Sequence, residues 1–286
     1  MSQELTRRVT EDDVHDHDRG LAFDVATLIS RRRALQLFAV GGLTTLVGCG
    51  ASSSSSPGTA SSASGSGATS STTAATAGAT AVIPGETAGP YPADGSNGVN
   101  VLTQSGIVRS DITTSFGSSS GRAAGVPLAI ELTILDVSAG GTPLEGAAVY
   151  LWHCDRDGQY SLYSSAISGE NYLRGVQASR AEGTVAFTSI FPAAYSGRWP
   201  HIHFEVYPSL AEATSAGTKM VTSQIALPEG ACKLVYATSG YEQSVQNLAQ
   251  SSLATDMVFG DGYSTQLGTA GGSPATGMTI ALNVGV

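Results

Sequence analysis

The feature of this 286-residue chain that most constrains its fold is a series of short segments rich in β-branched and aromatic residues. Clusters of Gly, Pro, Asp and Ser separate these segments, which is the pattern of strands joined by turns and loops. The segments are 127–137, 147–155, 183–191, 201–207, 220–227 and 277–286. One helical pattern is present, at 241–253. The spacing predicts an all-β fold, a β-sandwich of mainly antiparallel strands with long loops and little helix.

Residues 50–82 lack the side chains that a folded core needs. The stretch 51–80 consists of Ser, Gly, Ala and Thr with a single Pro, and it contains no charged or aromatic residue. Such a composition cannot bury enough apolar surface to offset the entropy of ordering the chain. We therefore expect residues 50–82 to be a flexible tether and residues 83–286 to form one domain.

The segment before the tether has the three parts of an export signal. Arginines at 31–33 precede an apolar run at 34–47, and small residues lead to Cys49. The apolar run is too short for a permanent membrane span. The arginine cluster before the run resembles a twin-arginine motif. The residues at the end of the run resemble a bacterial lipobox, in which Cys49 would be lipidated. Residues 1–49 are therefore interpreted as an export signal, and the protein is expected at the cell surface or outside the cell, touching the membrane only through its lipid anchor.

The charge of the chain argues against one class of partner. The sequence has 14 Lys and Arg residues against 23 Asp and Glu residues, a net charge of −9 at pH 7. A negative chain whose arginine cluster lies in the expected export signal repels phosphate backbones, so nucleic acid is not an expected partner.

Two histidines lie one residue apart in the strand-like segment HIHFEVY at 201–207. Because strand side chains alternate, His201 and His203 project to one face with their Cα atoms about 7 Å apart, the spacing of paired metal ligands. Iron and zinc seldom settle for two ligands, so further donors are expected. Tyr160 follows an Asp-Gly turn, and Tyr195 lies six residues before His201. Phenolate is a hard anionic donor that ferric iron can hold deprotonated.

Several motifs, taken together, resemble those of the intradiol ring-cleavage dioxygenases, the family of catechol and protocatechuate dioxygenases. The motifs are GQYS at 158–161, PAAY at 192–195, GRWPHIH at 197–203, ETAGPYPADG at 86–95, GIVRSDI at 106–112, PLEGAAVYLWHCD at 143–155 and NYLRGVQ at 171–177. The chain is most similar to the secreted, single-domain branch, because it carries an export signal and has no long helical N-terminal segment.

This resemblance implies a β-sandwich that holds non-haem Fe(III) and cleaves catechol-type rings with O2 to muconate-type diacids. The implied metal ligands are Tyr160, Tyr195, His201 and His203. The implied catalytic residues are Tyr195, Arg198 and Gln224, with Tyr195 taking a proton when substrate binds. The residues implied to approach the substrate are Thr87, Gly89, Pro90 and Tyr91.

Three other residues next to these motifs are interpreted individually. His153 has no partner at ligand spacing, so it is expected to be a hydrogen-bonded strand residue. Trp199 is of a type that usually packs in cores, although beside Arg198 it could line the substrate pocket. Arg198 would offset negative charge, because a catecholate dianion takes a site of Fe(III) and two tyrosinates to a net charge of −1.

Two cysteines remain in the expected mature domain, Cys154 and Cys232. In an exported protein a disulfide between them is the natural hypothesis. It would close a loop of about 78 residues and contribute roughly 4 kcal/mol in the chain-entropy model.

Two other classes of function remain open from the sequence. The strands also fit a non-catalytic cell-surface binding module with a sandwich fold, which would need no iron. A zinc or copper enzyme could use the His-x-His pair, although no third imidazole, carboxylate or thiolate lies at a familiar spacing.

Overall fold

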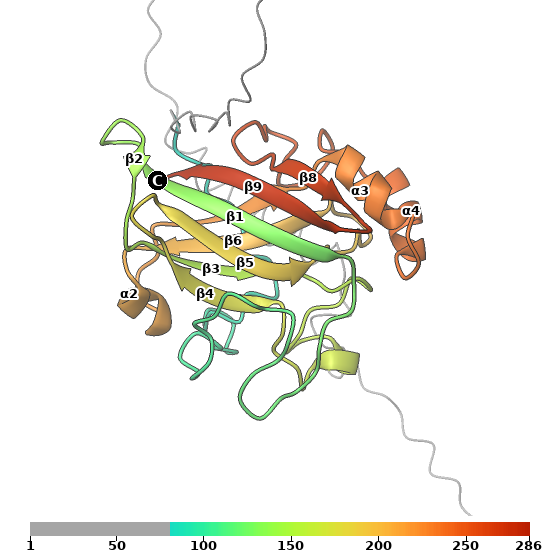
Figure 1. Ribbon diagram of the computed structural model, residues 1–286, viewed down its shortest axis with the longest axis horizontal. Helices are drawn as coiled ribbons and strands as arrows, with labels where there is room; N and C mark the ends of the chain where they lie inside the picture. The colour runs from blue at the N-terminus through green and yellow to red at the C-terminus, as the bar shows by residue number, and fades with distance from the viewer. Residues whose placement is uncertain (1–80) are drawn as a thin grey trace, which may run out of the picture. The chain divides into compact units, whose positions relative to one another are not determined.

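The structure is a computed structural model that describes residues 81–286 (Figure 1). The expected export signal at 1–49, with its lipidation site Cys49, and nearly all of the expected tether at 50–82 lie outside the described residues. Within residues 81–286, no helix is long and apolar enough to cross a membrane.

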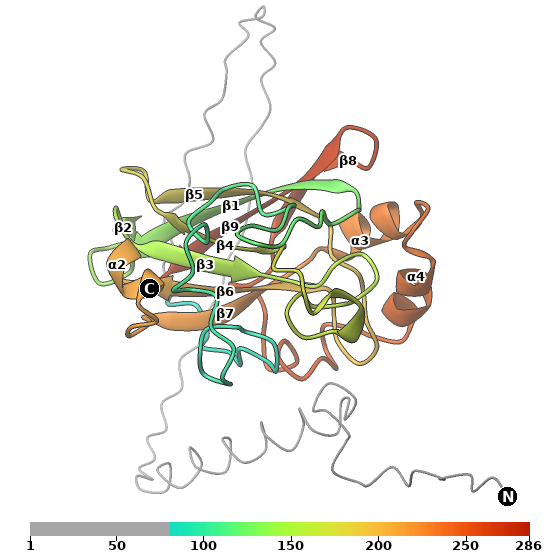
Figure 2. The same ribbon diagram turned by 90° about the horizontal axis from the view of Figure 1, so that it is seen from below.

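Two sheets face each other, which confirms the predicted β-sandwich (Figures 1 and 2). The first sheet has the order β2 (Thr142–Pro143), β1 (Pro127–Asp136), β9 (Gly277–Gly285) and β8 (Thr269–Ser273), with β5 (Thr184–Ile190) also paired to β1. The second sheet has the order β4 (Arg174–Ala178), β3 (Ala148–Trp152), β6 (His201–Tyr207) and β7 (Val221–Ala226). Every pairing is antiparallel except that of β1 with β9, which is parallel.

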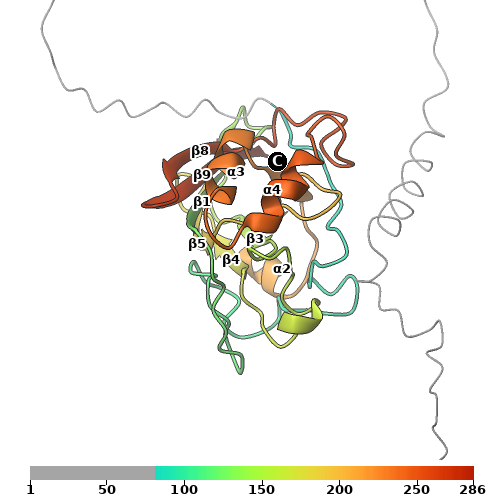
Figure 3. The same cartoon turned by 90° about the vertical axis from the view of Figure 1, so that its right-hand side faces the viewer.

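The helices are short and peripheral. They are η4 (Ser165–Ile167), α2 (Leu210–Thr214), α3 (Glu229–Tyr236) and α4 (Glu242–Ala249). The helix predicted at 241–253 is confirmed as α4, whereas α2 and α3 were not predicted. Helices α3 and α4 pack against each other at one end of the sandwich (Figures 1 and 3).

The main core lies between the sheets. Alternate residues of β1 point inward, and Ile130 and Leu132 pack in one cluster with Ile202 and Phe204 of β6. Apolar burial of this kind is the main stabilising contribution to a sandwich.

A second core covers the outer face of the second sheet. Val101, Leu102 and Ile107, from the irregular segment that precedes β1, pack there with Tyr150 and Trp152 of β3. Strand β6 is therefore buried on both faces along its whole length. Since the odd-numbered residues of β6 point to this outer face, the two predicted histidine ligands lie in a covered and largely dry environment.

Candidate metal centre

Four side chains converge on the outer face of the second sheet. The hydroxyl of Tyr160 lies 3.5 Å from that of Tyr195, which lies 3.1 Å from His201 Nε2. His201 Nε2 lies 3.1 Å from His203 Nε2. Donor atoms that share one ion at about 2.0–2.2 Å stand roughly 3 Å apart, so this chain of four donors has the spacing of a single metal centre. The structure thus brings together all four ligands that the sequence predicted.

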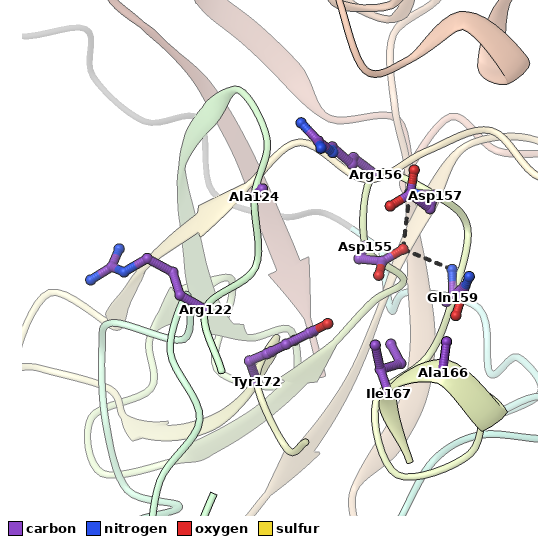
Figure 4. Close-up of a pocket in the computed structure, with 9 residues that line it drawn as sticks. All are labelled: Arg122, Ala124, Asp155, Arg156, Asp157, Gln159, Ala166, Ile167 and Tyr172. Carbon is purple, nitrogen blue, oxygen red and sulfur yellow. Dashed lines mark hydrogen bonds between the residues drawn. The ribbon is translucent and has the colours of Figure 1, made fainter. Parts of the chain in front are cut away.

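The two tyrosines reach the centre from loops that local backbone features shape. Asp155 Oδ1 accepts hydrogen bonds from the backbone N–H groups of Asp157 and Gln159, both at 2.9 Å, which turns the chain toward Tyr160 (Figure 4). Gly158 has φ +81°, and a Cβ there would lie 3.2 Å from Tyr195 Cβ. Glycine is therefore needed for both the conformation and the close approach of the two loops.

His201 presents an unprotonated nitrogen to the centre. His201 Nδ1 lies 2.6 Å from the carbonyl oxygen of Trp199. Because a carbonyl only accepts, Nδ1 carries the proton and the Nε2 lone pair faces the other donors. Burial, with the nearby Arg198 guanidinium, lowers the pKa of His201 well below its usual value, and burial also lowers that of His203. Neutral imidazole is the form that binds metal ions.

The phenol of Tyr160 needs a cation before it can ionise. Its side chain is buried, and burial followed by the neighbouring Tyr195 raises its pKa well above the usual value. A bound metal ion reverses such a shift by stabilising the phenolate. Two phenols and two neutral imidazoles with converging donor atoms therefore fit a ferric ion.

Arg198 is buried beside these donors. Its guanidinium forms an ion pair with Asp256, with Nε 3.0 Å from Oδ2, and Nη2 donates to Gln224 Oε1 at 2.7 Å. Nη1 lies 3.5 Å from His201 Nε2. Burial opposes the charge of Arg198, but Tyr195 and Asp256 outweigh it and hold its pKa above the usual value. The predicted residues Arg198 and Gln224 thus lie next to the four predicted metal ligands.

The substrate residues expected at 87–91 lie in residues 86–94, a segment that we call the strap. Gln224 Nε2 donates to the carbonyl oxygen of Thr87 at 2.9 Å. Gly89 has φ +69°, and a Cβ there would lie 3.4 Å from His203 Cε1. The ring of Tyr91 lies 4.9 Å from that of Tyr160. Pro90, between these residues, accepts a hydrogen bond from Asn97 through its carbonyl. The strap therefore forms one wall of the centre.

The expected pocket role of Trp199 is wrong. Its ring packs in the core between the sheets, and its indole Nε1 donates to the carbonyl of Leu227 at 2.9 Å. Only its backbone serves the centre, because its carbonyl orients His201 and its N–H donates to Asp256. His153 is confirmed as a hydrogen-bonded buried residue, with Nδ1 near the carbonyl of Cys154 and Nε2 near Ser189 Oγ, both at 2.7 Å.

The hypothesis of a disulfide is also wrong, because Cys154 and Cys232 are free, buried thiols. The two side chains pack in different core clusters. The Cys154 thiol lies 3.8 Å from the carbonyl oxygen of Ala193, and Cys232 lies in α3.

Sequence reasoning missed Asp256, which fixes Arg198 and also accepts from the backbone of Val258 and Phe259. It lies in an irregular loop with no motif that would have marked it. In residues 81–286, no group of three or more His, Cys, Asp or Glu side chains is arranged to hold a metal ion.

Residues 108–203, about a third of the chain, match a family model described as Dioxygenase. A chlorocatechol 1,2-dioxygenase from Rhodococcus opacus is 40% identical over 55 residues, which are 19% of this chain and 21% of the relative. The chain thus matches about a fifth of that relative's length. An intradiol ring-cleavage dioxygenase from Tetranychus urticae is similar in structure, with TM-score 0.55 and 24% identity over 72% of this chain and 94% of that one. A second dioxygenase structure has TM-score 0.52 and 25% identity, over 63% and 85% of the respective chains.

Proposed function

We propose that this chain is an exported non-haem Fe(III) enzyme of the intradiol ring-cleavage dioxygenase family, and the match of residues 108–203 to the Dioxygenase family model supports this proposal. It cleaves catechol-type rings between the two carbons that bear hydroxyl groups. One catechol and one O2 give one muconate-type diacid, so both oxygen atoms enter the product and no other reductant is consumed. The observation that carries the proposal is the convergence of two phenol oxygens and two imidazole nitrogens at one buried point.

The donor set supports iron as the resident metal. Tyr160, Tyr195, His201 and His203 would hold Fe(III), which draws electron density from a bound catecholate and makes its ring reactive toward O2. The carbonyl of Trp199 keeps His201 in the tautomer that this role requires. The second core and the strap limit access of water to the ligands, which strengthens each electrostatic interaction inside the centre.

Proton transfer and charge compensation are assigned to different residues. Tyr195 is partly exposed whereas Tyr160 is buried, and Tyr195 is the one that we assign to accept a substrate proton. Arg198 places a positive charge beside the donors, where negative charge accumulates when a catecholate binds. Gln224 joins Arg198 to the strap, since it accepts from one and donates to the other.

Export is the part of the proposal that rests on sequence alone. The arginine cluster, apolar run and Cys49 would direct the chain across the membrane and anchor it by a lipid. Metabolic labelling of the full chain with a radioactive fatty acid tests this part. The label is expected on the wild type and absent from Cys49→Ser, and equal labelling of the two would contradict lipidation at this site.

The decisive experiment combines metal analysis, the visible spectrum and O2 uptake of the iron-supplemented full chain. About one iron per chain is expected, with a visible charge-transfer band and O2 uptake upon addition of catechol. Tyr160→Phe should lose the band. Tyr163→Phe is the matched control and should keep it, because the Tyr163 hydroxyl bonds to Ala93 and Asn97 and not to a metal ligand.

Each alternative class of function predicts a different result in this experiment. A folded, colourless protein without metal would favour a binding module, and bound zinc or copper in place of iron would favour the other enzyme class. Either result would overturn the proposed function.

A further inference from the structure

Arg174 is a fully buried cation that the proposed chemistry does not use. It lies at the start of β4 with 1% of its surface exposed. All five of its N–H groups donate hydrogen bonds: Nε to Ser161 Oγ, Nη1 to Pro92 O and Tyr150 Oη, and Nη2 to Tyr91 O and Ser161 O, at 3.0–3.1 Å. The side chain is thus saturated with partners.

None of these partners is an anion. Among residues 81–286, the salt bridges are those of Arg198, Lys219 and Lys233, and no carboxylate pairs with Arg174. Burying a charge without a counter-ion is costly even when its hydrogen bonds are made. Because burying the Arg174 charge is costly, we look for the role of this side chain in the segments that its hydrogen bonds connect.

The guanidinium connects two segments that lie far apart in the sequence and meet at the metal centre. One is the strap, held through the carbonyls of Tyr91 and Pro92. The other is Ser161, which directly follows the ligand Tyr160 and is held through both its hydroxyl and its carbonyl. The rings of Tyr91 and Tyr160 lie 4.9 Å apart.

We propose that Arg174 is a positioning residue that sets the distance between the metal ligand Tyr160 and the substrate-facing wall formed by the strap. Its significance for catalysis rests on the proposed function, whereas the connection itself does not. Only a planar fork with five donors makes these contacts together. Lysine keeps the charge but has three donors on one nitrogen, so Arg174→Lys separates the geometry from the charge.

The chain offers a matched control in Arg109. Its guanidinium also donates to backbone carbonyls, those of Thr114, Asn171 and Arg174 itself. It is partly buried, and it contacts neither the strap nor Ser161 in these bonds. Arg109→Lys therefore removes several hydrogen bonds to backbone carbonyls, including the carbonyl of Arg174, but leaves the Arg174 guanidinium and its bonds to the strap and to Ser161 in place.

The first test measures amide hydrogen exchange in the strap of the iron-free full chain. Arg174→Lys is expected to speed exchange of residues 86–94 about tenfold, because local opening follows the loss of anchoring contacts, and Arg109→Lys should leave this segment unchanged. Equal exchange of the strap in wild type and Arg174→Lys would overturn the proposal. This result does not depend on iron or on turnover.

A milder variant serves if Arg174→Lys does not fold. Tyr150→Phe keeps the ring but removes a hydroxyl that donates to Pro92 and accepts from Arg174. It should speed strap exchange by a smaller factor than tenfold, and an unchanged strap would count against the connection.

The second test uses the iron-loaded enzyme. Arg174→Lys should raise KM for catechol about tenfold with full iron content and a smaller change in kcat, because the loss of the fork displaces the substrate wall and leaves all four ligands in place. Ser161→Ala should shift the charge-transfer band through Tyr160 and leave strap exchange unchanged. An unaltered KM in Arg174→Lys would show that the side chain only supports the fold. If the wild type binds no iron after iron loading and shows no turnover, the proposed function is refuted instead.

Discussion

At the scale of single residues, the candidate centre depends on the ion pair between Arg198 and Asp256, which is buried on both sides. Arg198→Leu leaves a buried carboxylate without its cation, and this should lower the free energy of unfolding by about 3–5 kcal/mol. It also removes the positive charge beside the ligands, so turnover should fall by on the order of 100-fold while iron remains bound. Urea denaturation and O2 uptake measure the two effects.

A double variant separates these two effects of the ion pair. Arg198→Leu combined with Asp256→Asn removes both charges, so much of the stability should return, but turnover should stay low. Recovery of turnover in the double variant would mean that Arg198 serves only to neutralise Asp256.

His153 predicts how stability depends on pH. Burial lowers its pKa from 6.5 to about 4, although the bond to the Cys154 carbonyl partly opposes the shift. Below pH 6.5 His153 therefore binds a proton in the unfolded chain, but in the folded chain it stays neutral down to about pH 4. Stability is lost as the pH falls from 6.5 to 4. At pH 5 the loss from this residue is about 2 kcal/mol. The urea midpoint should fall less between pH 7 and pH 5 in His153→Gln, and an equal fall would contradict this account.

The two buried cysteines predict how many thiols react with a thiol reagent. Burial raises the pKa of both thiols, that of Cys232 to about 12, so neither should react with a thiol reagent in the folded protein. After unfolding without reductant, a Cys49→Ala chain should show two free thiols. A count of zero would restore the disulfide hypothesis.

At the scale of the elements, all six predicted strand segments are strands, because their β-branched and aromatic residues bury at least one face. Strands β2, β4 and β8 were not predicted. β2 has only two residues, and β8, TAGGS, carries almost no apolar side chain, while β4 begins with Arg174 and Gly175. These strands are fixed by pairing with their neighbours, which no local pattern encodes.

The candidate site likewise combines residues marked by local motifs with residues placed by contacts between distant segments. The convergence of the four candidate ligands could be predicted because they lie in compact motifs, and the His-x-His spacing follows from the alternation of a strand. Asp256 and Arg174 could not, because each joins segments that are distant in the sequence and meets its partners only in the folded protein. The pocket role of Trp199 was wrong, because its ring packs in the core between the sheets.

A network of ion pairs between the strap and β6 gives a prediction at the scale of these elements. Lys219 donates to Asp94 of the strap and to Glu205 of β6, at 2.7 and 2.5 Å. Lys219→Met leaves two buried carboxylates without their cation, and because the Lys219 side chain is itself 34% exposed, the cost should be below that of a fully buried pair, about 2 kcal/mol. Lys233→Met is the control, because the pair of Lys233 with Glu229 on α3 is mostly exposed, and it should change stability by less than about 0.5 kcal/mol. Similar thermal midpoints for the two variants would contradict this reading.

At the scale of the whole molecule, the proposed iron links metal binding to stability. An ion that binds only the folded state adds about 4 kcal/mol at a free concentration 1,000 times its Kd. For a domain of this size that corresponds to a rise in Tm of about 10 °C. Scanning calorimetry before and after iron loading should show this rise in the wild type and little of it in His203→Ala. An iron-independent Tm in the wild type would argue against a metal at this centre.

The parallel pairing of β1 with β9 also governs how the molecule is made. Leu128 is paired with Met278, 150 positions further along the chain, and β9 lies between β1 and β8 in the first sheet. A nascent polypeptide on the ribosome therefore cannot complete this sheet until residues 277–285 have emerged, long after both tyrosine and both histidine ligands have been synthesised. Such long-range closure makes folding slow, and a translation product that stops before Gly277 would lack the strand that joins β1 to β8.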